Sequence, residues 1–262
     1  MPEGLTADAW AEYVAGYHDA NPGITEDVLV DARDDEGRSP YDWLVEAVPA
    51  GASTVIDLAC GSAPLARLLA GARVGGVDQS AGELTRAQEQ ARTGIRLLMR
   101  ASASAPPISD QCADAVVVSM ALMLLRPLDT VLAEIRRLLR PGGTVVATLP
   151  IRAASPGPDG APTFARILAA LGQSTNSYPE RLDDATLADR FSTARLTLGA
   201  DETRLFARTV ADPADAGQII RSFYAPGVAP DRVTAAVAEL EDQVRSAPVT
   251  ITYRIRRLVA RR

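Results

Sequence analysis

Between residues 54 and 149, short apolar runs alternate with amphipathic segments, and this alternation limits the fold more than any other feature of the sequence. Predicted strands lie at 54–58, 73–78, 95–99, 115–120 and 144–149. Predicted helices lie between them at 64–70, 81–92 and 128–139. Strands that alternate with helices form a parallel sheet with helices on both faces. The sequence therefore predicts a Rossmann-like, doubly wound α/β fold.

Two flanking regions extend this core. Residues 1–50 have a polar, helical pattern, and we expect them to form N-terminal helices. Residues 151–198 begin with a loop rich in proline and glycine, and we expect a small helical cap insertion there. Further strands are predicted at 203–210 and 249–259, separated by helices. The length of 262 residues fits a single domain spanning 1–262.

The charge of the chain argues against nucleic-acid binding, which generally uses a basic surface. The net charge is -6, and the sequence pI is about 5.0. A basic run at 254–262 falls in the last predicted strand, where alternate side chains face solvent, so we interpret it as the polar face of that strand. All 27 basic residues are arginine, and the absence of lysine excludes Schiff-base chemistry and a P-loop.

Composition also limits the compartment and the metal chemistry. Cys60 and Cys112 form no C-x-x-C pair, and one histidine with scattered acids predicts no metal site. No apolar run approaches the roughly 20 residues that span a bilayer, and the first residues do not resemble a signal peptide. We therefore expect a cytoplasmic protein that does not bind membranes.

The most informative segment is 55–64, a predicted strand followed by small residues and a helix. Small residues let the backbone approach a ligand, and the N-terminus of a helix favours negatively charged groups. Asp78 ends the next strand, 21 residues after Asp57, a spacing typical of an acid that binds ribose hydroxyls. The dinucleotide pattern G-x-G-x-x-G fits poorly, because its positions hold Ala59, Gly61 and Pro64. The residues predict a nucleotide-like ligand and by themselves do not separate NAD from S-adenosylmethionine (SAM).

Four segments in order resemble the motifs of class I SAM-dependent methyltransferases of the small-molecule, methyltransferase-11-like type. They are 57–63 (DLACGSA), 76–80 (GVDQS), 107–114 (PISDQCAD) and 138–143 (LLRPGG). The resemblance implies a seven-stranded sheet, mostly parallel with an antiparallel last strand, and N-terminal helices that act as a lid. It also implies SAM as the cofactor.

The resemblance implies a role for each matching residue. The methionine part of SAM would lie over Ala59, Cys60 and Gly61, with Asp57 holding its amino group directly or through water. Asp78 would bind the ribose and Gln79 would flank the adenine. Residues expected at the adenine edge are Ala101, Ser102 and Ala103, and those expected near the methyl group are Ser119 and Met120.

The motifs also depart from the family pattern. Ala59 and Ala63 replace two glycines, and Ser102 stands where many members have an aspartate for the adenine amino group. A hydroxyl can accept that hydrogen bond, without the assistance of a charge. Two simpler interpretations stay open: Asp57 could cap the following helix, and Met120 could be a core residue.

Aromatic residues outside the motifs are candidates for the lid and the substrate wall. Tyr13 and Tyr17 are four residues apart and share one helix face, followed by the single histidine, His18. We expect Tyr17 to contact the cofactor and His18 to act as a base or a substrate contact, and the alternative for His18 is a solvated helix residue. Substrate-wall candidates are Tyr13, Phe164, Tyr178, Phe223 and Tyr224, for which simple packing is the alternative.

These observations predict SAM-dependent methyl transfer to a small-molecule acceptor. The alanine- and arginine-rich, lysine-free composition resembles proteins of GC-rich genomes, where many such enzymes act in secondary metabolism. One alternative is a SAM-fold protein repurposed as a non-methylating cyclase or isomerase. Others are a non-catalytic binding protein and an NAD-dependent oxidoreductase, the last disfavoured by Pro64. The sequence does not distinguish O-, N- and C-methylation and carries no signal for the oligomeric state.

Overall fold

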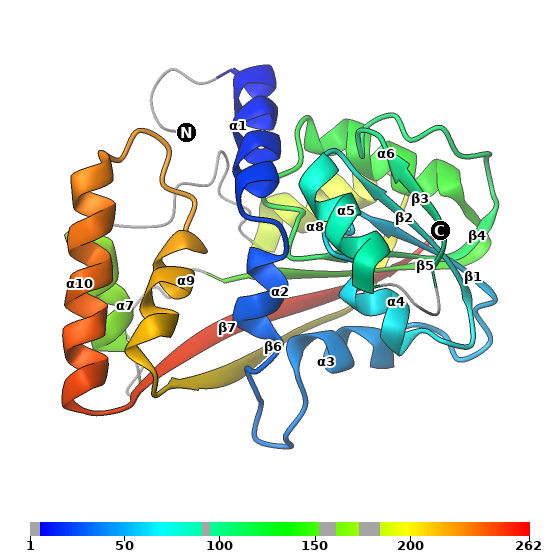
Figure 1. The fold of residues 1–262 in the computed structure, drawn as a ribbon. Helices are drawn as coiled ribbons and strands as arrows, with labels where there is room; N and C mark the ends of the chain where they lie inside the picture. Colours follow the sequence, from blue (N-terminus) through cyan, green and yellow to red (C-terminus); the bar gives the residue numbers. More distant parts are fainter. Residues whose placement is uncertain (1–5, 91–94, 152–160, 173–183) are drawn as a thin grey trace.

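A seven-stranded sheet forms the centre of the computed structural model, which describes residues 6–90, 95–151, 161–172 and 184–262 (Figure 1). The strand order is β3-β2-β1-β4-β5-β7-β6. The strands are β1 (Thr54–Leu58), β2 (Arg73–Asp78), β3 (Ile95–Arg100), β4 (Ala113–Ser119), β5 (Leu139–Pro150), β6 (Thr197–Val210) and β7 (Val249–Arg261). The first five are parallel, and β7 is antiparallel to both neighbours. The predicted Rossmann-like, mostly parallel sheet is therefore confirmed.

Helices cover both faces of this sheet. The helices are α1 (Ala7–Ala20), α2 (Ile24–Leu29), α3 (Pro40–Glu46), α4 (Pro64–Leu68), α5 (Ala81–Gln90), α6 (Leu128–Leu138), α7 (Ala161–Ala170), α8 (Asp184–Thr193), the 3-10 turn η1 (Pro213–Asp215), α9 (Ala216–Arg221) and α10 (Pro230–Ser246). Within the described ranges, none of them combines the length and the apolar character needed to cross a membrane.

Alternating side chains of the central strands build two separate apolar cores. Val117 of β4 packs in one core with residues of α2, α3, α4 and α5. Its neighbours Val116 and Val118 pack in the other core with residues of α6 and α8. Successive side chains of a strand point to opposite faces, so an unbroken valine run fits a strand covered on both sides. This explains why residues 115–118 lack a polar position.

The strand order reverses at β1, which lies between β2 and β4. The chain leaves β1 toward β2 and β3 on one side, and later builds β4 and β5 on the other side. In open α/β sheets, ligands bind beyond the carboxyl ends of the strands at this point of reversal. The fold therefore places the residues that follow β1, β2 and β4 around one cavity.

The hairpin of β6 and β7 extends beyond β5. The pairing of β5 with β7 ends at Pro150 and Ile255, whereas β6 continues to pair as far as Val210 and Val249. In Figure 1, α7, α9 and α10 gather around this extension, and α10 packs against both other helices. The extension thus carries its own helical layer, which belongs to the same core as α2 to α5.

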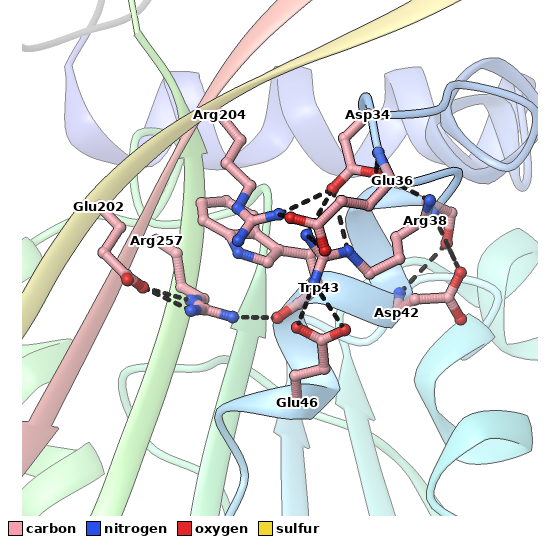
Figure 2. Close-up of polar contacts among 10 residues, drawn as sticks. Asp34, Glu36, Arg38, Asp42, Trp43, Glu46, Glu202, Arg204 and Arg257 are labelled. Atoms are coloured by element: carbon pink, nitrogen blue, oxygen red, sulfur yellow. Dashed lines mark hydrogen bonds and ion pairs between the residues drawn. The ribbon is translucent and has the colours of Figure 1, made fainter.

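Trp43 of α3 anchors the hairpin to the N-terminal region (Figure 2). The guanidinium carbons of Arg204 and Arg257 lie 5.3 Å and 4.4 Å from its ring centroid. Arg257 also forms an ion pair with Glu202 and donates a hydrogen bond to the carbonyl oxygen of Trp43. Cation–π contacts of this kind are strongest where water is excluded.

The prediction that the C-terminal arginines form a solvated polar face is wrong for two of them. Arg256 and Arg257 are 3% and 9% exposed, and they pair with Asp201 and Glu202 on β6. The physical reason is that both faces of β7 are covered: Ile255 packs in one apolar core and Leu258 in the other, and the Trp43 ring of α3 lies against Arg257. The carboxylates across the hairpin compensate the buried charges.

Candidate active site

The loop between β1 and α4 adopts an unusual backbone conformation. Ala59, Gly61 and Ala63 have φ angles of 57°, 54° and 57°. The left-handed region is disfavoured for residues with a Cβ, so two alanines held there indicate that the surroundings fix the loop. The amide of Cys60 donates to the carbonyl oxygen of Val77 at 3.0 Å, which joins the loop to β2. The small residues that the sequence suggested for close ligand approach therefore form a tight turn at the reversal point of the sheet.

Asp78 at the end of β2 connects the two loops that flank the cavity. One carboxyl oxygen accepts from the amide of Gly61 at 2.8 Å, and the other accepts from the amide of Ser80 at 2.9 Å. Burial raises the pKa of Asp78, whereas these two N–H groups favour its ionised form. Each carboxylate oxygen keeps a further lone pair for a ligand hydroxyl group.

Asp57 is a buried acid without a hydrogen-bond partner among the described residues. It is 1% exposed, and neither carboxyl oxygen is hydrogen-bonded. Burial raises its pKa to about 8, and the charge of Asp78 contributes in the same direction. Asp57 is not among the residues that line the cavity. Its predicted contact with a ligand amino group, directly or through water, stays a prediction.

A single cavity brings together most of the residues that the motifs suggested. It is bounded by the loop after β1, the end of β2, the segment after β3, the end of β4, and α1. The predicted site residues that line it are His18, Ala59, Cys60, Gly61, Asp78, Gln79, Ala101, Ser102, Ala103, Ser119, Met120 and Tyr224. Toward the end of β4 the lining becomes apolar, with Ala121, Leu124 and Val131. The cavity thus has a polar part near the two loops and an apolar part near α6.

The end of α1 lies directly against the start of α5. Asp19 accepts hydrogen bonds from the Ser80 hydroxyl at 2.7 Å and from the Gly82 amide at 3.0 Å. The Gly82 amide and, after it, the Ser80 hydroxyl lower the pKa of Asp19. A Cβ on Gly82 would lie 3.0 Å from the Asp19 carbonyl oxygen, so a larger residue would push the helices apart. These contacts hold α1 over the cavity, where the sequence predicted a lid.

His18 lies between an acid and a phenol inside the cavity. Its Nδ1 is 2.7 Å from Oε1 of Glu83, and its Nε2 is 2.8 Å from the hydroxyl oxygen of Tyr224. The second oxygen of Glu83 accepts from the amide of Gly23 at 2.8 Å. His18 is therefore not the solvated helix residue that the sequence left open, because it has defined partners on both ring nitrogens.

Other predicted site residues lie outside the cavity wall. The hydroxyl of Tyr17 donates to the carbonyl oxygen of Arg221, and that of Tyr13 accepts from the amide of Ala225 at 3.1 Å. Phe223 is 8% exposed and packs in the core beside α9. Phe164 lies in α7, but its side chain is outside the described structure. Tyr178 lies outside the described residues. No residue of 161–172 or 184–198, the described parts of the insertion, lines the cavity.

Three acids at the site were missed in the sequence analysis. Glu83, Glu26 and Asp19 all contact the loops of the cavity, and Glu26 accepts from the hydroxyl of Ser62 at 2.6 Å. A signal for Glu83 exists, since Ser80-x-x-Glu83 matches a capping box. Ser80 does accept from the Glu83 amide at 3.1 Å, but the Glu83 side chain turns to His18 and Gly23 instead of capping. In the described ranges, no three metal-binding side chains are grouped to hold an ion.

The strand order β3-β2-β1-β4-β5-β7-β6 with an antiparallel β7 is the mostly parallel, seven-stranded sheet that the resemblance to class I methyltransferases implied. Residues 56–147 match the family described as the methyltransferase domain, Methyltransf_11. The match covers 92 of the 262 residues, and it confirms the resemblance seen in the four motifs.

Solved structures support the same fold. The (4+2)-cyclase SpnF is 18% identical, with a TM-score of 0.63, over 95% of this chain and 94% of that chain. A candidate type II methyltransferase from Anaeromyxobacter dehalogenans is 21% identical, with a TM-score of 0.61, over 84% and 94%. A candidate methyltransferase from Bacillus halodurans C-125 is 16% identical, with a TM-score of 0.57, over 85% and 98%. A comparison with curated protein sequences gives no match. At these identities the likeness concerns the fold alone.

Proposed function

We propose that this chain is a cytoplasmic methyltransferase that binds SAM and methylates a small, partly apolar acceptor in secondary metabolism. The observation that carries the proposal is Asp78, whose two oxygens are bonded to the Gly61 and Ser80 amides at the edge of the cavity. A carboxylate fixed in this way presents its remaining lone pairs to a diol. The match of residues 56–147 to the methyltransferase domain supports the same assignment.

The chemistry of the cavity fits SAM. SAM carries an ammonium group, a sulfonium centre and a ribose diol, and the cavity wall contains the acids Asp78, Glu83 and Glu26. Asp57, at the end of β1, has two buried carboxyl oxygens without a hydrogen bond among the described residues. Opposite charge near a buried carboxylate lowers the cost of its burial. Because the lining holds these three carboxyl groups against one guanidinium, that of Arg126, it favours a cationic ligand.

Each part of the cavity would contribute to alignment. The turn at Ala59–Gly61 would hold the methionine part, Asp78 the ribose, and Ser102 the adenine edge. SAM supplies an activated methyl group when it is bound, so the protein mainly orients the acceptor and excludes water. The apolar end near Ala121 and Leu124 would hold the acceptor.

Isothermal calorimetry with SAM tests the binding proposal. We expect micromolar binding by the wild-type protein and at least tenfold weaker binding by Asp78→Asn, which removes the charge and keeps the size. Asp242→Asn on α10 is the matched control, because its side chain is 77% exposed, and its affinity should equal that of the wild type. Absence of SAM binding by the wild-type protein would overturn the proposal.

Product analysis separates methyl transfer from the alternative. Release of S-adenosylhomocysteine with a methylated acceptor would support the methyltransferase function. SAM binding with chemical conversion of a substrate, but without S-adenosylhomocysteine, would instead indicate a repurposed cyclase or isomerase.

A further inference from the structure

Two serine hydroxyl groups contact each other on the cavity wall, in the segment that follows β3. The side-chain oxygens of Ser102 and Ser104 are 2.8 Å apart, and the Ser102 oxygen also accepts from the Ser104 amide at 3.2 Å. The amide of Ala105 donates to the carbonyl oxygen of Ser102 at 3.1 Å, which closes a turn. Both serines line the cavity. A serine that bonds to the backbone two residues ahead holds such a turn, so the pair has a defined position toward a ligand.

The order of the strands places this pair beside the base of the proposed cofactor. Strands β1, β2 and β3 are neighbours in that order, and the Ala101 amide after β3 donates to the carbonyl oxygen of Asp78 at 2.9 Å. In the proposed function, the methionine part lies at the turn after β1 and the ribose at Asp78. The ribose of SAM lies between the methionine part and the adenine. The adenine therefore extends toward the segment after β3, where Ser102 and Ser104 line the cavity.

The two hydroxyl groups have more hydrogen-bonding capacity than their own contacts use. A hydroxyl group has one proton and two lone pairs, so the pair has two protons and four lone pairs. The bond between the serines uses one proton and one lone pair, and the Ser104 amide uses a second lone pair, on Ser102. One proton and two lone pairs are left for a ligand.

Either serine can be the donor of the bond between them, and this choice decides which groups face a ligand. If Ser102 donates, Ser104 has the free proton and Ser102 keeps a lone pair. If Ser104 donates, Ser102 has the free proton and Ser104 keeps its lone pairs. The order of donor and acceptor along the pair thus reverses when the two hydroxyl protons rotate, and no heavy atom has to move.

We propose that Ser102 and Ser104 bind the edge of the purine base and accept both a 6-amino and a 6-oxo base, an inference that rests on the proposed SAM binding. Adenine presents the N–H donor of its amino group beside a ring nitrogen that accepts. Hypoxanthine presents a carbonyl oxygen that accepts beside a ring N–H donor. These two patterns are the reverse of each other, and the serine pair matches each of them in one of its two arrangements.

The departure from the family pattern at Ser102 therefore changes base selectivity. An ionised aspartate has only acceptors, so it can bind the amino group of adenine but is repelled by the carbonyl oxygen of hypoxanthine. Its hydrogen bond to adenine is also the stronger one, because it is assisted by a charge. A hydroxyl pair gives up this strength and this discrimination together.

Calorimetry with two ligands tests the inference without any methyl acceptor. S-inosylhomocysteine has hypoxanthine in place of adenine and is otherwise identical to S-adenosylhomocysteine. We expect the wild-type affinities for the two ligands to agree within about fivefold, since the same number of neutral hydrogen bonds is formed. In Ser102→Asp the preference for S-adenosylhomocysteine should rise at least about tenfold.

Two further variants separate the pair from general effects. Ser104→Ala removes one hydroxyl group and should weaken both ligands by about threefold to tenfold, with their ratio near that of the wild type. Ser109→Asp is the matched control for the added charge, because Ser109 is exposed, lies in the same loop and does not line the cavity. Both of its affinities should equal those of the wild type.

The outcomes distinguish this inference from the function on which it rests. A wild-type preference for S-adenosylhomocysteine above about tenfold would overturn the inference and leave the proposed SAM site intact. An unchanged preference in Ser102→Asp would also overturn it, because the base would then not contact these hydroxyl groups. Failure of the wild type to bind either ligand would refute the proposed SAM site itself.

Discussion

Asp57 makes the free energy of the folded state depend on pH, because its carboxyl group is buried. A carboxyl group that is 1% exposed and has no hydrogen-bond partner among the described residues is costly to ionise. Burial, with a contribution from Asp78, raises its pKa from 3.8 to about 8. The folded protein therefore holds a proton on Asp57 at pH values where the unfolded chain has released it.

The first prediction concerns the pH dependence of stability. Below pH 4, Asp57 is protonated in both the folded and the unfolded state, and its contribution to the free energy of unfolding is fully present. As the pH rises toward 8, the folded state binds more protons than the unfolded state, so the free energy of unfolding falls by up to about 1.4 kcal/mol per pH unit. Urea unfolding between pH 4 and 8 should show this fall in the wild type relative to Asp57→Asn. A difference that does not vary with pH would contradict the raised pKa.

A second prediction compares two glycines with opposite surroundings. A Cβ on Gly76 of β2 would lie 2.8 Å from Sγ of Cys60 and 2.9 Å from Leu98, whereas a Cβ on Gly16 of α1 would meet no atom within 4 Å. Gly76→Ala should destabilise by about 1–3 kcal/mol through overpacking. Gly16→Ala should stabilise by roughly 0.5–1 kcal/mol through helix propensity. Thermal unfolding of both variants shows whether each substitution raises or lowers the stability. A change in the same direction for both would contradict the close packing around Gly76.

At the scale of elements, the β6–β7 hairpin depends on α3. Arg257 of β7 contacts the ring and the carbonyl oxygen of Trp43 in α3, and it forms an ion pair with Glu202 on β6 (Figure 2). A short antiparallel bridge between Arg33 and Ala207 adds a second attachment. Two-stranded hairpins are marginal alone, so these contacts stabilise the extension that carries α9 and α10.

The third prediction tests this attachment. Arg257→Ala leaves the buried carbonyl oxygen of Trp43 without its donor, and should lower the free energy of unfolding by about 1–3 kcal/mol. Arg245→Ala on α10 is the control, because that arginine is 55% exposed and pairs with Glu241 and Asp242 on the surface. Its effect should be much smaller than that of Arg257→Ala, because an exposed ion pair is screened by solvent. Urea denaturation gives both values, and similar effects would refute the role of Arg257.

A second contact between elements joins α1 to the segment after α9. Tyr13, Tyr17 and His18 bond to Ala225, Arg221 and Tyr224, respectively, and the rings of Tyr17 and Tyr224 lie 4.7 Å apart. Residues three to four positions apart share a helix face, so one face of α1 makes all of these contacts. Helix α1, which lines the cavity, is thus held by the C-terminal half of the chain.

For the whole molecule, we predict that residues 1–262 unfold as one domain. The two tryptophans report on the two cores: Trp10 packs with α6, and Trp43 packs with α2 to α4, both with 0% exposure. The central sheet contributes side chains to both cores, so neither can open alone. In the single-tryptophan variants Trp10→Phe and Trp43→Phe, fluorescence and circular dichroism should give coincident urea midpoints. Separate midpoints within one variant would indicate two independently folding units.

The sequence by itself determined the parts that depend on local pattern. Runs of apolar residues and the spacing between Asp57 and Asp78 predicted the parallel strands and the small-residue turn, because period and turn chemistry act over short distances. The start of β6 could not be predicted in this way, because residues 197–202 (TLGADE) contain a single large apolar residue and are extended through their pairing with β7.

Only the tertiary structure decided which side chains meet at the cavity. His18 is 65 residues from Glu83 and 206 residues from Tyr224, and no periodicity relates them. It also decided that Arg256 and Arg257 are buried, since a strand pattern gives the face of a side chain but not what covers that face. Local propensities determine the helices and strands. The burial of side chains and the hydrogen bonds between distant residues depend instead on contacts that form only when the sheet and its helices have packed together.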